Sequence, residues 1–246
     1  MAGHSAWKNI KRRKAAVDAK RGKVWSKVSR AIIVAAQRGG GDPKFNAILR
    51  LAIDEAKAAN MPRDTIEKAV KKGTGELGAE RYDSVRYEGY GPGGVAFLCD
   101  LLIANANRTA AEIRTILDKN GGKLGVPGSV AFGFTQQGVI LVPTSASVTE
   151  DRVLEVALGL EVDDVKGDGE VVQVTCGPAE LDRVKTGLEA AGLLIEGAEV
   201  TWTPQSTVAV DVETGRKLLV LLEAVEDHDD VQKIWHNAEI PDESYP

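Results

Sequence analysis

The residues with the most evident chemistry are cations crowded at the start of the chain. Up to Arg38 the sequence holds eleven Lys and Arg but only one carboxylate, Asp18. Lysine offers a point charge to phosphate, and arginine can donate two parallel hydrogen bonds to its oxygens. Trp7 and His4 add planar groups that can stack on unpaired bases. This combination indicates binding to a polyanion such as nucleic acid.

The positive charge is confined to one part of the chain. Residues 1–75 hold 18 Lys and Arg against 6 Asp and Glu, a net charge of +12. The other 171 residues hold 13 against 30, a net charge of −17, so the whole chain of 246 residues carries −5. Such asymmetry predicts one basic module that binds nucleic acid and an acidic remainder that repels it.

Other kinds of site have no comparable support. Residues 89–94 match the spacing of a dinucleotide-binding loop, but they lead into a strand-like run rather than a helix, which predicts a plain turn. Segment 226–230 lacks the ligand spacing of a calcium loop and is interpreted as a solvated turn. We therefore expect no metal, no cofactor, no small-molecule substrate and no enzymatic activity. A catalytic triad assembled from distant residues would leave no sequence signal.

Composition also suggests where the protein works. The sequence has neither the ~20 apolar residues that span a bilayer nor the ~7–15 that a secretory signal needs. Cys99 and Cys176 lie in apolar runs and are expected to be buried free thiols in a reducing compartment. We expect a soluble, cytoplasmic protein without a membrane partner. An Arg-rich, acid-poor start is also typical of mitochondrial presequences, so that origin stays open.

A helix must position the second half of the basic segment. From Asp18 onward, apolar residues recur at helical spacing within an arc of about 100° on a helical wheel. A neighbouring arc of about 80° holds cations. We expect the apolar stripe to pack in a core and the basic stripe to remain in water. The apolar residues are Trp25, Val28, Ile32, Ala35 and Ala36, and the cations are Lys20, Lys23, Lys27, Arg30 and Arg38.

Two further helices complete a small bundle. Three glycines at 39–41 end the first helix, and Asp42 and Pro43 predict the N-cap and first turn of the second, whose buried side includes Phe45. A third helix begins after Pro62. Residues 1–17, before the bundle, include few apolar residues. This composition predicts an arm that becomes ordered only when it binds its partner.

Beyond residue 82 the pattern changes to strands. Residues 139–203 follow a β-α-β-β-α-β order, which is typical of a ferredoxin-like unit. Further strands and a helix precede it, including a strand at 129–134, and a strand, a helix and a strand follow it. We therefore predict an α+β protein in which an N-terminal three-helix bundle precedes two ferredoxin-like α/β domains, one inserted in the other. The predicted divisions are a basic flexible arm at 1–17, the bundle at 18–80, a discontinuous α/β domain at 81–136 plus 204–246, and the inserted domain at 137–203.

Several segments of the chain form a distinctive set: Met1-Ala2-Gly3-His4-Ser5, Asp18-Ala19-Lys20-Arg21-Gly22-Lys23, Gly39-Gly40-Gly41-Asp42-Pro43, Lys57-Ala58-Ala59-Asn60-Met61-Pro62, Lys72-Gly73-Thr74-Gly75, Tyr87-Glu88-Gly89-Tyr90-Gly91-Pro92-Gly93-Gly94, Asn107-Arg108-Thr109 and His236-Asn237-Ala238. Together they resemble the YebC/PmpR family, whose mitochondrial relatives are translational activators for a cytochrome oxidase subunit. The resemblance covers nearly the whole chain and is densest up to about residue 135. At Ala6, Arg12 and Trp25 the family usually has Lys, His and Phe.

The resemblance implies a three-domain, nucleic-acid-binding regulator of gene expression in the bacterial cytoplasm. In one account of the family, its members bind promoter DNA and regulate transcription. In another, they bind ribosomal RNA near the catalytic centre of the ribosome and relieve stalling, for example at proline runs. A protein-binding scaffold without enzymatic activity is a third alternative. The residues that we expect to contact nucleic acid are His4, Ser5, Trp7, Lys8, Asn9, Lys11, Arg12, Arg13, Lys14, Lys20, Arg21, Lys23, Lys27 and Arg30.

Overall fold

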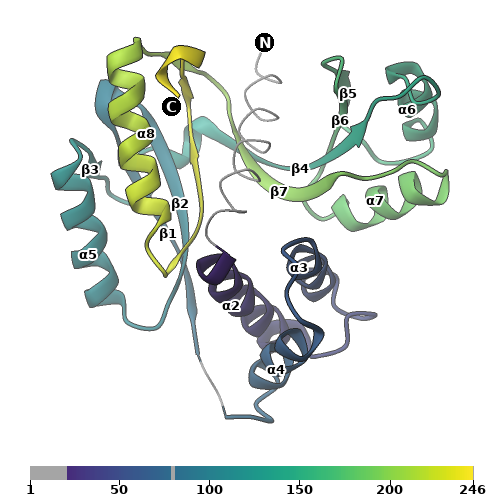
Figure 1. The fold of residues 1–246 in the computed structure, drawn as a ribbon, viewed down its shortest axis with the longest axis horizontal. Coiled ribbons are helices and arrows are strands. Elements are labelled where there is room, and N and C mark those ends of the chain that lie inside the picture. The colour runs from purple at the N-terminus through teal and green to yellow at the C-terminus, as the bar shows by residue number, and fades with distance from the viewer. Residues whose placement is uncertain (1–20, 79–80, 246) are drawn as a thin grey trace. The chain divides into compact units, whose positions relative to one another are not determined.

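The structure is a computed structural model that describes residues 21–78 and 81–245. These residues form two compact units (Figure 1). One unit holds Phe134–Gln205, and the other holds the described residues up to Gly133 together with those from Ser206 onward. The predicted arm at 1–17 lies outside the described residues. The residue boundaries predicted for the domains stay predictions.

Three helices form a bundle at the start of the larger unit. They are α2 (Arg21–Gly39), α3 (Ala47–Ala58) and α4 (Arg63–Gly73). The apolar stripe predicted for α2 packs in the bundle core, where Val28 and Ile32 are buried against Leu49 and Ile66 of the other two helices. Trp25 is only partly buried, and its indole Nε1 donates a hydrogen bond to the Ala59 carbonyl at 3.0 Å, which ties α2 to the end of α3.

The start of α3 differs from the prediction. Asn46, not Asp42, is the N-cap: its Oδ1 accepts a hydrogen bond from the Leu49 amide at 3.0 Å. Its Nδ2 donates to two backbone carbonyls of the preceding chain, each at 2.9 Å. Asn46 is buried and bonded in both directions, so it is a stronger cap than the upstream aspartate. Phe45 consequently lies outside the helix and is 88% exposed, and its predicted place in the core is wrong.

Because the Phe45 side chain already lies in solvent, its truncation should cost little. Phe45→Ala is expected to change the free energy of unfolding by less than about 0.5 kcal/mol. Urea unfolding followed by circular dichroism measures this change, and Phe132→Ala, at another exposed phenylalanine, is the matched control. A loss above about 3 kcal/mol, as for a buried aromatic, would restore the core assignment.

After the bundle, the larger unit continues as an antiparallel four-stranded sheet with the order β3-β1-β2-β9. Two helices, α5 and α8, lie side by side over the sheet (Figure 1). Ile113 of α5 and Leu218 of α8 share one buried cluster with Phe97 and Leu101 of β2. The elements are β1 (Asp83–Tyr90), β2 (Ala96–Ile103), α5 (Ala106–Lys119), β3 (Lys123–Leu124), α8 (Val212–Glu226) and β9 (Val231–His236), with a short parallel pair formed by β8 (Val208–Ala209) and β10 (Ala238–Glu239).

The smaller unit has a β-α-β-β-α-β chain order and the strand order β5-β6-β4-β7, which is the ferredoxin-like arrangement. The strands of the larger sheet, in the order β9-β2-β1-β3, occupy the same positions as β7-β4-β6-β5 of the smaller unit. The chain order differs, because β1, which takes the position of β6, precedes the other strands of its sheet. The predicted fold class is therefore confirmed. The elements are β4 (Phe134–Pro143), α6 (Glu150–Ala157), β5 (Asp164–Gly167), β6 (Val171–Cys176), α7 (Leu181–Ala190) and β7 (Gly197–Pro204).

The strand predicted at 129–134 is instead mostly a turn before β4. The carboxylate of Glu88 accepts hydrogen bonds from the backbone amides of Gly128, Val130 and Ala131 at 2.6, 2.7 and 2.9 Å. Burial tends to raise the pKa of Glu88, but these hydrogen bonds outweigh it and bring the pKa below its usual value. The prediction failed because a single buried carboxylate, distant in sequence, fixes this backbone.

Two sequence-based expectations about single residues and segments agree with the structure. Cys99 and Cys176 are buried free thiols, and burial raises the pKa of both. Residues 92–94 form a short turn between β1 and β2, not a nucleotide-binding loop that leads into a helix. Among the described residues, none of the helices has both the length and the apolar character needed to cross a membrane.

Burial lowers the pKa of His236, the last residue of β9, to about 4. Its Nδ1 also accepts a hydrogen bond from the Ala238 amide at 3.2 Å, which requires an unprotonated nitrogen. The unfolded chain, with an ordinary histidine pKa near 6.5, takes up the proton first. The stabilisation from neutral His236 is therefore fully present above about pH 6.5 and is lost as the pH falls towards 4.

We expect wild-type protein to lose about 1–2 kcal/mol more of its free energy of unfolding than His236→Asn between pH 7 and pH 4.5. Urea titrations of both proteins at several pH values give the difference. The carboxylates titrate in both proteins, so the comparison isolates the histidine. Parallel pH profiles would rule out this role of His236.

Candidate nucleic-acid interface

Three described cations of the predicted stripe are also predicted to contact nucleic acid, namely Lys23, Lys27 and Arg30, and they are called the basic stripe of α2 from here on. Arg38, at the end of the same helix, is exposed as expected. Helical spacing places these side chains on one side of α2, next to its buried stripe. Lys23 is exposed, whereas Lys27 and Arg30 are partly buried. The interpretation of this stripe as a face that remains in water is therefore wrong for Lys27 and Arg30.

The basic stripe contacts the turn that follows α8 (Figure 1). Lys23 Nζ lies 3.2 Å from the Asp227 carbonyl oxygen and 3.6 Å from its carboxylate Oδ2. Lys27 Nζ donates to the carbonyl oxygen of Glu226. The two lysines thus bind the last carbonyls of α8, where unpaired acceptors and the helix dipole favour cations.

Arg30 extends these contacts to the far end of the turn. Its Nη1 donates to the Asp229 carbonyl oxygen and lies 2.9 Å from Asp230 Oδ1. Its guanidinium also lies 5.4 Å from the centre of the Tyr82 ring, a distance that permits a cation–π interaction. Arg30 therefore joins the bundle to both the turn and the start of β1.

Asp230 is the centre of this contact and is only 2% exposed. In addition to Arg30, its carboxylate accepts a hydrogen bond of 2.5 Å from Thr109 Oγ1 and lies 3.4 Å from Arg108 Nη2. Burial tends to raise the pKa of Asp230, but the Thr109 hydrogen bond and the positive charges around it outweigh burial, so the pKa lies below its usual value. The interpretation of this segment as a solvated turn is wrong at Asp230.

His228 closes the other side of the turn. The Asp230 amide donates to His228 Nδ1 at 3.1 Å, so the proton of the neutral ring is on Nε2. Nε2 lies 2.9 Å from Glu112 Oε2 on α5. The turn is therefore held by α2 of the bundle and, through His228 and Asp230, by α5, the helix that packs over the sheet.

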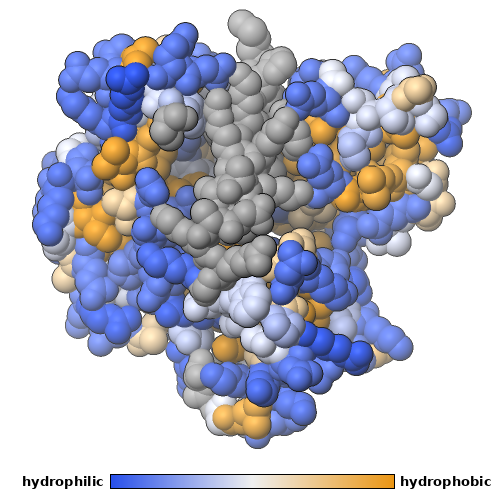
Figure 2. All heavy atoms as spheres, in the orientation of Figure 1, coloured by the Kyte–Doolittle hydropathy of each residue, from blue (hydrophilic) through white to orange (hydrophobic). Residues whose placement is uncertain are grey.

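The surface around this contact is largely polar. Figure 2 shows mostly hydrophilic residues on the described part of the larger unit, with an apolar area near α5. In the described residues, no cluster of three or more His, Cys, Asp and Glu could hold a metal ion. Charge, more than apolar area, is thus the recognition chemistry that this face presents.

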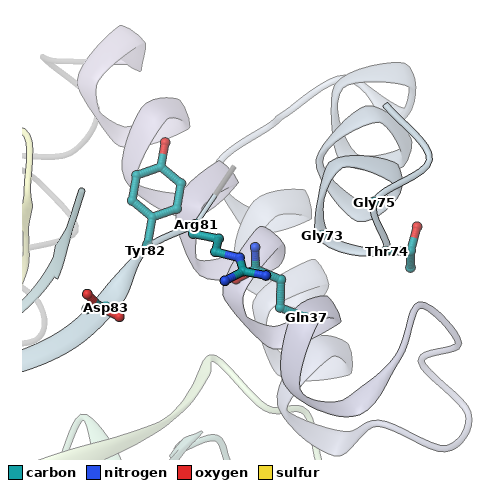
Figure 3. A pocket seen from close by; sticks show the side chains of 7 residues that line it. All are labelled: Gln37, Gly73, Thr74, Gly75, Arg81, Tyr82 and Asp83. Carbon is teal, nitrogen blue, oxygen red and sulfur yellow. The ribbon is translucent and has the colours of Figure 1, made fainter. Parts of the chain in front are cut away.

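A hollow of about 420 Å³ lies where the ends of α2 and α4 meet the start of β1 (Figure 3). The Arg81 side chain extends towards Gln37, whereas the Tyr82 ring points away from it. Thr74 already donates its hydroxyl to the Lys71 carbonyl at 3.2 Å. The lining includes both Arg81 and Asp83, so the hollow has no single charge that would select a ligand.

The structure describes four of the fourteen residues that are predicted to contact nucleic acid. Those from His4 to Lys20 lie outside the described residues, and Arg21 is placed only by its backbone in α2. Lys23, Lys27 and Arg30 are brought together. Sequence reasoning did not find Arg108, which adds a fourth cation to this cluster through Asp230. Arg108 belongs to the segment Asn107-Arg108-Thr109, but no local pattern links it to residues more than a hundred positions away.

Family models match both parts of the chain. The model described as the TACO1/YebC protein N-terminal domain matches residues 5–76. The model described as the TACO1/YebC second and third domain matches residues 82–238. Together they cover the bundle and both sheets.

Proteins of known sequence and structure are similar over nearly the full length. A "probable transcriptional regulatory protein" of Solidesulfovibrio magneticus is 46% identical over 245 residues and covers 100% of both chains. One of Rhodopirellula baltica, with the same description, is 49% identical over 99% of each chain. The crystal structure of a conserved hypothetical protein from Aquifex aeolicus has 48% identity and a TM-score of 0.81, over 92% of this chain and 93% of that one.

Proposed function

Because the chain belongs to the TACO1/YebC family, we propose that it is a regulator of gene expression that acts by binding nucleic acid, with promoter DNA as the first candidate target. The observation that carries this proposal is the net charge of +12 on residues 1–75, against −17 on the rest. The names of the Solidesulfovibrio and Rhodopirellula relatives support transcription as the process.

The arm supplies the chemistry of the proposed contact. Cations from Lys8 to Lys14 can each neutralise a phosphate and release its counterions. His4 and Trp7 can stack on bases, and Ser5 and Asn9 can hydrogen-bond to phosphate or base edges. Lys20 and Arg21 would continue this contact into α2.

Ribosomal RNA is the second candidate target, and one observation favours it. The most basic of the described helices, α2, directs its stripe at the turn after α8, so that stripe is not presented to a major groove in this arrangement. Arm residues that stack on unpaired bases suit irregular RNA better than a regular duplex.

Crosslinking of bound nucleic acid in cells, followed by sequencing, tests the proposal. Peaks at promoters would support DNA as the target. Crosslinks concentrated in large-subunit ribosomal RNA or transfer RNA would replace DNA with RNA. A pull-down whose partners persist after nuclease treatment, without any crosslinked nucleic acid, would instead indicate a protein-binding scaffold and overturn the proposal.

A further inference from the structure

The turn at 226–230 presents negatively polarised oxygens to the basic stripe, as the phosphates of a nucleic-acid backbone would. Lys23, Lys27 and Arg30 each bind an oxygen of this turn, and two of its carboxylates take part. The carbonyls of Glu226 and Asp227 add the negative end of the α8 dipole. In charge and in hydrogen-bond acceptors, the turn resembles a short phosphate backbone.

We propose that residues 226–230 are an internal competitor for nucleic acid: they cover the α2 stripe in the free protein, and a bound nucleic acid displaces their outer part. This inference rests on the proposed function, because it concerns the same basic module. If the turn competes in this way, the affinity of the protein for nucleic acid depends on the acidic residues at 226–230 as well as on the cations of α2.

The contacts divide into a fixed part and a displaceable part. Asp230 is buried and held by Arg30, Arg108 and Thr109, so its removal would take away the carboxylate that joins these three side chains. The pair of Lys23 and Asp227 is different, since the two side chains are 48% and 40% exposed. Exposed pairs are weak and are screened by salt. A polyphosphate can therefore replace Asp227 on Lys23 while Asp230 keeps the turn attached.

Asp227→Asn tests the inference without disturbing the helix. Asp227 is the C-cap of α8, where a negative charge opposes the helix dipole and asparagine is well tolerated. Asp118→Asn is the matched control, because Asp118 is an exposed carboxylate of α5 in the same unit and its neutralisation changes the net charge equally. Lys23→Gln, alone and combined with Asp227→Asn, tests whether the two residues act on each other.

The measurement is fluorescence anisotropy of the full chain with two labelled probes, a 20-base-pair DNA duplex and a single-stranded RNA of 20 nucleotides, at several salt concentrations. Asp227→Asn is expected to bind about twofold to fivefold more tightly than Asp118→Asn. The gain should vanish in the Lys23→Gln background, because no cation is then released.

The outcomes separate the inference from the function on which it rests. If wild-type protein binds a probe and Asp227→Asn equals Asp118→Asn, the inference is wrong and the proposed function stands. A gain that persists in Lys23→Gln also overturns it, since the effect is then general electrostatics. If wild-type protein binds neither probe, the proposed function fails and the inference fails with it.

Discussion

Nucleic-acid affinity is expected to fall about 10³–10⁴-fold at ~0.1 M salt when five cations of the arm are replaced by alanine. Each Lys or Arg that neutralises a phosphate contributes about 0.9 to the slope of log K against log salt for duplex DNA, and about 0.7 for single strands. Five lost contacts therefore reduce the slope by about 4.5 or about 3.5. The substituted residues are Lys8, Lys11, Arg12, Arg13 and Lys14.

This loss should occur without loss of the fold. Lysine and arginine side chains are almost never fully buried unless they are paired, so their replacement by alanine should leave the buried apolar clusters of the described residues unchanged. The thermal midpoint is expected to change by no more than about 2 °C. A large drop in thermal stability would show that the arm is part of the core.

A charge-matched control separates local contacts from net charge. The control variant loses five cations from the acidic remainder of the chain and should retain most of the affinity and of the salt slope. Equal losses in both variants would contradict a specific role of the arm. The control residues are Lys119, Lys123, Arg152, Lys166 and Lys217.

Asp230→Ala is expected to destabilise the protein by about 3–5 kcal/mol, the largest stability effect predicted for a single residue. The substitution removes the carboxylate that pairs with the partly buried Arg30 and with Arg108. It also removes the nearer of two acceptors of the buried Thr109 hydroxyl, which lies 2.5 Å from Asp230 and 3.0 Å from the Asn105 carbonyl oxygen. The loss of a charged partner in such a poorly solvated place is costly even where weaker partners remain. Urea unfolding at pH 7 measures the loss.

Two further variants keep this prediction testable. Asp230→Asn retains an acceptor for Thr109 but not the charge, and should lose less, about 2–3 kcal/mol. Asp227→Asn, on the exposed side of the same turn, should stay within about 0.5 kcal/mol of wild type. If Asp230→Ala is as stable as Asp227→Asn, Asp230 is not the anchor of the turn.

The acid dependence follows from the lowered pKa of Asp230. The unfolded chain binds the proton at a higher pH than the folded chain, so the stabilisation is fully present above the ordinary aspartate pKa of about 3.9. It is lost as the pH falls through the lower pKa of the folded state. Asp230→Asn should accordingly show a smaller loss of stability below about pH 4 than wild type.

Local signals predicted much of the fold, and they failed where a buried side chain made a longer-range contact. Helical periodicity correctly identified the packing stripe of α2. Thr109, four residues after the N-cap Asn105 of α5, is buried against Asp230 of a distant turn, and no local pattern in the sequence shows this contact. In the same way, Asn46 replaced Asp42 as the cap of α3, and Glu88 turned an expected strand into a turn.

The sequence by itself determined the order of the elements, the ferredoxin-like pattern and the concentration of positive charge in one module, because periodicity and composition are local properties. Only the tertiary structure decided which groups the cations of α2 contact. Arg30 and Asp230 are separated by 200 positions, and their pairing depends on how the bundle packs beside the end of α8. A stripe of cations has the same sequence pattern whether it faces water, nucleic acid or an acidic turn, because each of the three can solvate or pair with positive charge.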